Sequence, residues 1–119
     1  MTEQTPSLDH PKVVRGTKPR YEIFVDDSGE PAGKTYFTDR ESVAGVRQRI
    51  FPHTEVGEEF GGHGLASKLV RAALDASVDE GYRIVTVCPY VKGWVEKHPE
   101  YQEHVDPTTP EHLQALQSR

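Results

Sequence analysis

The stretch Gly61–Cys88 (GGHGLASKLVRAALDASVDEGYRIVTVC) decides the fold. Within it, apolar residues recur at three- and four-residue steps over residues 65–80, which predicts an amphipathic helix. Gly81 follows as a helix-ending glycine. The next residues, Tyr82–Cys88, are mostly apolar, which is typical of a strand buried on both faces and paired in parallel through a helical crossover. The sequence therefore predicts a glycine turn, a central helix and a parallel strand in succession.

Three strands are expected before this stretch. Tyr21–Asp26 and Ala32–Phe37 flank an Asp-Ser-Gly turn and are rich in aromatic and β-branched residues, which predicts a hairpin. Val46–Val56 alternates less regularly, and we interpret it as a long third strand. Pro52 cannot donate a ladder hydrogen bond, so this strand is expected either to lie at an edge of the sheet or to bulge beside His53.

The rest of the chain sets the expected domain boundaries. Val91–Lys97 can form a second short helix, which Pro99 ends. Residues 1–19 are rich in proline and are expected to form a flexible N-terminal arm, residues 20–105 the folded domain, and residues 106–119 a C-terminal tail with at most one short helix. The predicted fold is a small mixed α/β domain of the α+β class, with a mixed twisted sheet, a central helix after the glycine turn and a second short helix.

Length and composition exclude several classes of protein. A chain of 119 residues suffices for one core, which excludes multidomain enzymes and full-size barrels. It has no apolar run near the ~18 residues of a membrane span, and its first residues lack the apolar stretch of a secretion signal. We therefore expect a cytoplasmic protein without a membrane partner. The single cysteine, Cys88, cannot form an internal disulfide.

The net charge of −5 is unevenly distributed. Residues 21–60 hold nine acidic and four basic side chains, and no basic stripe could displace counterions from nucleic-acid phosphates. We therefore expect no nucleic-acid partner. An acidic surface suits a cationic amine acceptor, although it equally describes a solvated face that keeps the protein soluble. Nothing in the sequence demands an oligomer, and we expect a monomer.

The glycine turn is the first candidate for a binding site. Gly61, Gly62 and Gly64 stand where a helix begins, so main-chain N–H groups there can approach an anion such as a pyrophosphate. The alternative is a tight structural turn that needs positive φ angles. A P-loop is excluded because Leu65 stands where its lysine is required, and a dinucleotide-binding fold needs a larger sheet. Coenzyme A remains the natural phosphate-bearing ligand for so small a fold.

His53 and Cys88 are the candidate chemical groups because each stands at the carboxyl end of a predicted strand beside the helix, where ligands collect. A free thiol is only about 3% ionised at pH 7, and a neighbouring histidine would raise that fraction. The alternatives are a small buried core residue for Cys88 and, for His53, a side chain satisfied by the backbone or by Thr54. We expect no metal, because the spacing of His63, His98, His104 and His112 selects none.

Four segments in order carry a family resemblance. They are His53–Val56 (HTEV), Gly62–Ala66 (GHGLA), Cys88–Val91 (CPYV) and Lys97–Tyr101 (KHPEY). Together they closely resemble the minimal single-domain N-acetyltransferases of the GNAT superfamily, over roughly residues 21–105. A G-x-G turn alone would be weak support, but four ordered segments within about fifty residues make a specific match.

The resemblance implies an acetyl-CoA-dependent acyltransferase that needs no metal. The strand ending at Val56 would diverge from the strand ending at Cys88, and the slot between them would take the pantetheine arm. Cys88 and His53 would be the catalytic pair, and the segment from Trp94 to Tyr101 would lie against the coenzyme. The implied coenzyme-binding residues are Val56, Gly61, Gly62, His63, Gly64, Leu65, Ala66, Trp94, Lys97 and His98.

One departure from the family pattern leaves alternatives open. Family members usually carry arginine or glutamine at the position of Glu59, or arginine where Gly61 stands, and a carboxylate there would weaken coenzyme binding if it faces the phosphates. The activity expected is N-acetylation of a small-molecule or lysine-type amine, with His53 as the preferred base and Glu55 as a weaker one. Cys88 would either accept the acetyl group or line the site during direct attack. The alternatives are a non-catalytic acyl-CoA-binding or protein-interaction module and a purely structural domain.

Overall fold

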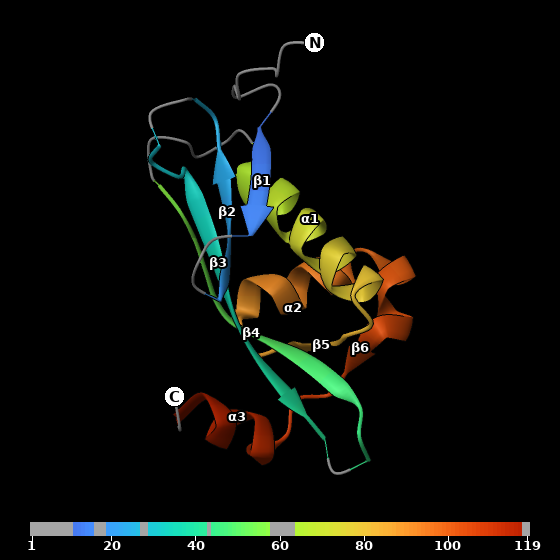
Figure 1. Cartoon of the computed structure of the whole chain (residues 1–119). Coiled ribbons are helices and arrows are strands. Elements are labelled where there is room, and N and C mark those ends of the chain that lie inside the picture. Colours follow the sequence, from blue (N-terminus) through green and yellow to red (C-terminus); the bar gives the residue numbers. More distant parts are fainter. Residues whose placement is uncertain (1–10, 16–18, 27–28, 43, 58–63, 118–119) are drawn as a thin grey trace.

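The computed structural model describes residues 11–15, 19–26, 29–42, 44–57 and 64–117. Strands in this part of the chain form one sheet in the order β1-β2-β3-β4-β5-β6, antiparallel from β1 to β4 and parallel from β4 to β6 (Figure 1). The elements are β1 (Lys12–Arg15), β2 (Arg20–Phe24), β3 (Gly33–Glu41), β4 (Arg47–Val56), α1 (Leu65–Asp79), β5 (Arg83–Thr86), α2 (Pro89–Glu96), the 3-10 helix η2 (Pro99–His104), β6 (Val105–Asp106) and α3 (Pro110–Gln117). The predicted fold class is confirmed.

The β2–β3 hairpin forms as predicted. Its apolar residues alternate toward the core, where Tyr21 and Ile23 of β2 and Phe37 of β3 are buried. β3 is longer than the sequence predicts and continues to Glu41. The polar residues at its end stay extended because residues 38–41 of β3 pair with residues 47–50 of β4.

β4 lies inside the sheet, between β3 and β5, and it contains the bulge predicted at its proline. Tyr36 of β3 faces His53, whereas Thr38 faces Ile50, so β4 holds one more residue than β3 in this interval. Pro52 lies in that interval, where the ladder is interrupted and no donor is required. The edge-strand alternative is wrong.

The two predicted helices cover one face of the sheet. α1 buries its apolar stripe, including Leu65, Leu69 and Ala73, and α2 starts with proline at its first position, where no N–H is needed. Both helices contact β4 and β5 and they contact each other (Figure 1). The glycine after α1, Gly81, has a φ of 87°, a left-handed conformation that ends the helix as predicted.

β5 pairs in parallel with β4 over four residues, from Gln48–Arg83 to Phe51–Thr86, as the sequence predicts. Ile84 and Val85 are fully buried, which agrees with the predicted burial on both faces. The strand is shorter than the predicted Tyr82–Cys88 because Cys88 already caps the next helix.

The prediction that residues 1–19 form an arm is wrong for Lys12–Arg15. These residues form β1, which pairs with β2 along its full length, and Val13 packs against the core. Two adjacent valines are enough to order this short strand, because its backbone hydrogen bonds to β2 supply the remaining interactions.

The predicted C-terminal tail contains one short helix, α3, in agreement with the prediction of at most one, and α3 is attached to the sheet. His112 of α3 is only 2% exposed, and its Nε2 lies 2.9 Å from the Oε1 of Gln48 in β4. Upstream of α3, the Thr108 hydroxyl donates to the carbonyl of Thr86 at 3.3 Å. Within the described residues, none of the helices has the length and apolar character needed to cross a membrane.

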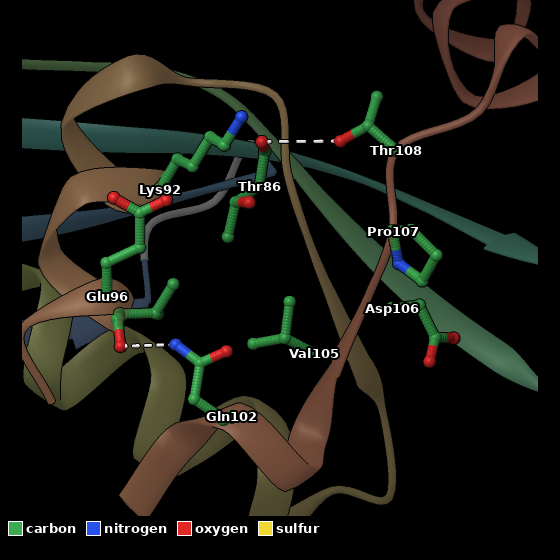
Figure 2. A pocket seen from close by; sticks show the side chains of 9 residues that line it. Thr86, Lys92, Glu96, Gln102, Val105, Asp106, Pro107 and Thr108 are labelled. Carbon is green, nitrogen blue, oxygen red and sulfur yellow. Dashed lines mark hydrogen bonds between the residues drawn. The ribbon is translucent and has the colours of Figure 1, made fainter. Parts of the chain in front are cut away.

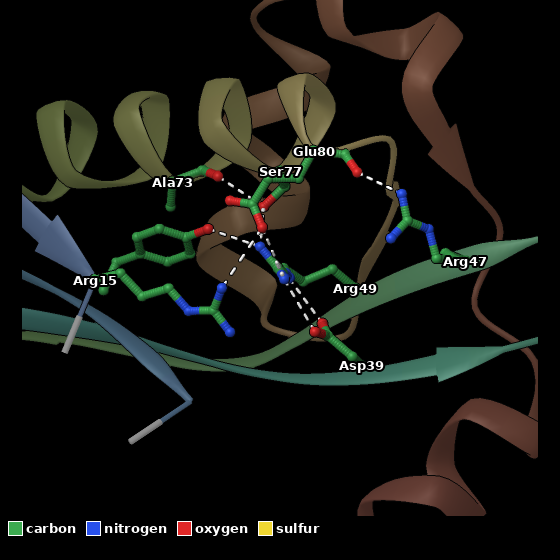
Figure 3. A network of polar contacts seen from close by, with 8 residues as sticks. Arg15, Asp39, Arg47, Arg49, Ala73, Ser77 and Glu80 are labelled. Atoms are coloured by element: carbon green, nitrogen blue, oxygen red, sulfur yellow. Dashed lines mark hydrogen bonds and ion pairs between the residues drawn. The ribbon is translucent and has the colours of Figure 1, made fainter. Parts of the chain in front are cut away.

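A buried arginine, which the sequence analysis did not single out, joins β3 and β4 to the end of α1. Arg49 is 1% exposed and donates to both carboxylate oxygens of Asp39, at 2.7 and 2.9 Å, and to the Tyr21 hydroxyl at 2.7 Å (Figure 3). Its guanidinium also lies over the rings of Phe37 and Tyr82. Burial opposes the charged form, but Asp39 and Tyr21 outweigh it and raise the pKa of Arg49 above its usual value.

Candidate active site

The parallel pairing of β4 and β5 stops where β4 continues, which opens a gap in the sheet. The last paired residues are Phe51 and Thr86, and the last bond between the two segments runs from the Cys88 N–H to the Phe51 carbonyl at 2.8 Å. β4 then continues to Val56 without β5 beside it. The strand divergence expected from the resemblance is therefore present.

The main chain of Val56 faces this gap. The N–H of the next residue, Gly57, donates to the Ala32 carbonyl at 2.9 Å on the β3 side. Because N–H groups alternate in direction along an antiparallel strand, the N–H of Val56 points away from β3, toward the side that β5 has left. The same alternation directs the N–H of Thr54 into the gap.

Cys88 lies at the closed end of the gap, as the N-cap residue of α2. Its side chain is 4% exposed, and its thiol donates to the Thr54 hydroxyl at 3.7 Å. The Thr54 hydroxyl in turn lies 2.8 Å from the hydroxyl of Thr35, which is fully buried. The thiol therefore contacts the Thr54 hydroxyl, which is itself hydrogen-bonded to Thr35 on the helix-covered face of the sheet.

His53 lies on the opposite face of β4 from Thr54, because successive side chains of a strand point to opposite faces. Its ring stacks on Tyr36, with centroids 5.8 Å apart, and its Nε2 lies 3.2 Å from the Oε2 of Glu55. The His53 side chain is 60% exposed. The structure therefore does not bring His53 and Cys88 side by side: they flank the gap from two faces. Glu55, rather than Thr54, is the hydrogen-bond partner of His53.

Part of the predicted phosphate turn falls outside the described residues, namely Gly61, Gly62, His63 and the neighbouring Glu59. Gly64 is the N-cap of α1 with a φ of 70°, a left-handed conformation that suits glycine. Within the part of the chain that the structure describes, no side chain caps this helix start, and its first turn, which includes Leu65 and Ala66, contains no acidic residue. This end of α1 therefore has the polarity that attracts an anion.

Three other predicted coenzyme residues gather on α2 and just after its C-terminal end: Trp94, Lys97 and His98. The Trp94 indole N–H donates to the Ser67 hydroxyl of α1 at 2.8 Å, and the ring of His98 stacks on the indole, with centroids 3.8 Å apart. Lys97 shares with Trp94 a pocket of about 210 Å³ along α2, whose other lining residues are Pro89, Tyr90 and Gly93. Pro89 of this pocket follows Cys88 in the chain, and Trp94 connects the pocket to Ser67 in the first turn of α1.

Several neighbours of the site were missed from the sequence. Tyr90 lies within the CPYV segment, yet no role was assigned to it; burial, and then the negative charge of an ionised Cys88, raise its pKa. Arg71 of α1 lies over the Trp94 ring at 5.2 Å. Ser67 and Arg71 stand four residues apart on the predicted helix, a spacing that places them on one face and could have indicated a shared partner.

A second pocket, of about 360 Å³, lies on the other side of α2, against β6 (Figure 2). Its polar groups include Lys92 and Glu96 of α2, and hydrogen bonds from Thr108 to the Thr86 carbonyl and from Gln102 to the Val95 carbonyl close two of its sides. None of the residues predicted from the sequence lines it. Among the described residues, there is no group of three or more histidine, cysteine or acidic side chains arranged to hold a metal ion.

Comparison with known proteins places this geometry in a family. The family model described as GCN5-related N-acetyl-transferase matches residues 20–104. Protein NATD1 of chicken (Gallus gallus) is 39% identical over 57 residues, which cover 46% of this chain and 52% of that protein. The human NATD1 protein is 37% identical over 57 residues, covering 46% of this chain and 50% of that protein. The chain thus spans about half the length of the curated relatives it matches.

Two solved structures share the fold. A GCN5-like N-acetyltransferase structure from Staphylococcus aureus has a TM-score of 0.60 at 21% identity and covers 85% of this chain and 93% of its own. The ribosomal-protein-alanine N-acetyltransferase of Brucella melitensis biovar Abortus has a TM-score of 0.53 at 21% identity, covering 76% of this chain and 62% of its own. At these identities the likeness concerns the fold, and the family model carries the assignment. The chain belongs to the GCN5-related N-acetyltransferase family.

Proposed function

We propose that the protein is an acetyl-CoA-dependent N-acetyltransferase that acts on an amine acceptor. The observation that carries this proposal is the gap between β4 and β5, closed at one end by Cys88, in a chain of this family. The acceptor is proposed to be a small molecule or a lysine-type side chain, neither a nucleic acid nor a membrane component.

The residues around the gap fit the coenzyme. Free main-chain N–H groups of Thr54 and Val56 would hold the pantetheine amides, since these groups have no strand partner on that side. The uncapped start of α1 suits the pyrophosphate, with residues 61–66 around it. Lys97 and Arg71 add positive charge near Trp94, which would favour the coenzyme phosphates. The coenzyme supplies the acetyl group as an activated thioester.

The chain's own residues supply proton transfer. An alkylammonium with an ordinary pKa near 10.4 is under about 0.1% neutral at pH 7, so a base must take its proton before nitrogen attacks the thioester carbon. His53, exposed on the open face and hydrogen-bonded to Glu55, would accept that proton. When the carbon–sulfur bond breaks, the departing thiolate needs a proton. Tyr90, in the first turn of α2 two residues after Cys88, is the proposed donor, because a phenol is protonated at neutral pH.

Cys88 has two possible roles in this scheme. Its thiolate attacks the acetyl carbon and carries the group as a thioester, releasing the coenzyme thiol, or it lines the site while the amine attacks directly. The first role needs Cys88 in its thiolate form, because the thiolate is the nucleophile. Mass spectrometry of the protein after mixing with acetyl-CoA alone distinguishes the two roles, because only the first leaves an acetyl group on Cys88.

The test of the proposed function combines binding and turnover. Calorimetric titration with acetyl-CoA is expected to show a one-to-one complex, and at 100 times the dissociation constant the ligand should stabilise the protein by about 2.7 kcal/mol. A panel of primary amines should then be acetylated, with activity lost in His53→Ala. No binding at all would contradict the proposal and support a purely structural domain.

A second candidate is a non-catalytic acyl-CoA-binding or protein-interaction module. The placement of His53 and Cys88 on opposite faces of β4 favours it, because no side-chain contact pairs them. Acetyl-CoA binding without acetylation of any amine in the panel, and without acetyl-Cys88, would support this candidate.

A further inference from the structure

We propose that Thr54 is a positioning residue for Cys88, acting as a reversible hydrogen-bond partner of both the thiol and the thiolate. This inference rests on the proposed function in one respect, namely that Cys88 takes part in the reaction. Its basis is the chain of contacts from Cys88 to Thr54 at 3.7 Å and from Thr54 to Thr35 at 2.8 Å.

The backbone fixes this hydroxyl pair. Thr35 and Thr54 are direct cross-strand partners, and the hydrogen bond from Gly57 to Ala32 makes theirs a non-hydrogen-bonded pair, in which side chains approach most closely. Thr35 is fully buried, with 0% of its surface exposed to solvent, so water does not compete for its hydroxyl. Both threonine side chains are β-branched and have few rotamers, which holds the two oxygens in place.

A hydroxyl can donate and accept, so this pair has two complementary states. With Cys88 as a thiol, its S–H donates to Thr54, and the Thr54 O–H donates to Thr35. With Cys88 as a thiolate, the Thr54 O–H turns to donate to the sulfur, and the Thr35 O–H donates to Thr54. Thr54 therefore stabilises the charged form without moving a heavy atom. No proton leaves the pair, because only the hydroxyl hydrogens rotate.

Replacing the Thr54 hydroxyl tests this directly. Because Cys88 is the only cysteine, the ultraviolet absorbance of the thiolate, measured against Cys88→Ala, reports this residue alone. Tyr90 on α2 is the titratable neighbour, and its ionisation is followed separately through the tyrosinate absorbance at longer wavelength, because Cys88→Ala also removes one cause of the raised Tyr90 pKa. Thr54→Val is isosteric and removes the hydroxyl, whereas Thr54→Ser keeps it.

The expected result is that Thr54→Val raises the pH midpoint of thiolate formation by about one unit, so that about tenfold less thiolate is present at neutral pH, and that Thr54→Ser restores the midpoint. Thr35→Val is expected to shift it less, because Thr54 can still donate. If Thr54→Val does not fold, Thr54→Ala serves in its place. An unchanged midpoint in a folded Thr54→Val or Thr54→Ala variant would overturn the inference.

This titration is independent of the proposed function, because it requires neither acetyl-CoA nor turnover. Absence of acetyl-CoA binding by the unmodified protein would refute the function whatever the midpoint does. Normal coenzyme binding and turnover with an unmoved midpoint would refute only the role of Thr54.

Discussion

At the scale of single residues, Arg49 shows how one buried charge connects several elements. Replacing it with methionine removes the cation but leaves Asp39 and the Tyr21 hydroxyl without their donor. Removing one partner of a buried pair costs about 3 to 5 kcal/mol, but Asp39 keeps 31% of its side chain exposed and water offsets part of the loss. We therefore expect Arg49→Met to destabilise the protein by about 2 to 4 kcal/mol in urea unfolding.

Arg49→Lys is the matched control, because it keeps the charge and loses the two-pronged contact with Asp39. Its loss of stability should be smaller than that of the methionine variant. Equal stability of Arg49→Met and the unmodified protein would show that the network of Figure 3 contributes nothing to folding.

The same scale shows what residue patterns could not predict. An arginine within an alternating strand sequence gives no sign of burial, since its partners Asp39 and Glu80 come from separate elements. Likewise, the contact of Thr54 with Cys88 depends on the bulge at Pro52, which sets the face that each later residue of β4 occupies. These contacts are set by tertiary structure and leave no local signal.

At the scale of elements, the attachment of α3 should depend on pH. Nδ1 of His112 accepts from the Thr109 N–H at 3.0 Å, so a neutral ring donates from Nε2 to Gln48. Burial and the nearby Arg40 lower the pKa of His112, against the opposing effects of Glu111 and Asp106. The unfolded chain binds a proton at His112 near the ordinary histidine pKa of about 6.5, whereas the folded chain binds it only at lower pH. The stability that neutral His112 contributes to the attachment of α3 is therefore present above about pH 6.5 and is lost as pH falls.

Between about pH 7 and 5.5 we expect the protection of the α3 amides against hydrogen exchange to fall, after correction for the intrinsic slowing of exchange at lower pH, while α1 stays protected. His112→Asn is the control, because its side-chain oxygen can accept from Thr109 without titrating in this range. The pKa of Asp106 is also lowered: burial opposes this, but hydrogen bonds from Gln48 and Arg83 prevail. The stability that the ionised Asp106 carboxylate contributes is lost only at more acidic pH, below about 4. An α3 equally protected at both pH values would contradict the assignment to His112.

At the scale of the whole molecule, the elements with a clear hydrophobic periodicity could be predicted from the sequence, whereas the elements and contacts that depend on tertiary packing could not. The central helix, the hairpin and the parallel strand follow from patterns within 65–80, 21–37 and 82–88. β1 was missed because four residues carry too little pattern, and its partner β2 supplies the order. For the site, position along the chain placed Cys88 just after a buried strand, and the family resemblance implied the divergence of the two strands. The sequence could not show that His53 points to the opposite face of β4 from Thr54 and Cys88, because the single extra residue at the bulge decides the face that His53 occupies.

The placement of these groups on two faces of the sheet predicts that coenzyme binding and catalysis can be impaired separately. The side chains that we propose to bind the coenzyme, Trp94 among them, lie on the face covered by α1 and α2, whereas His53 and Glu55 lie on the opposite face of β4. His53→Gln is therefore expected to lower kcat by about 10² to 10⁴ and leave the dissociation constant of acetyl-CoA unchanged. Lys97→Ala is expected to weaken acetyl-CoA binding with little effect on kcat at saturation. Calorimetry and steady-state rates on both variants would measure this separation, and weaker coenzyme binding in His53→Gln would show that the two faces act as one site.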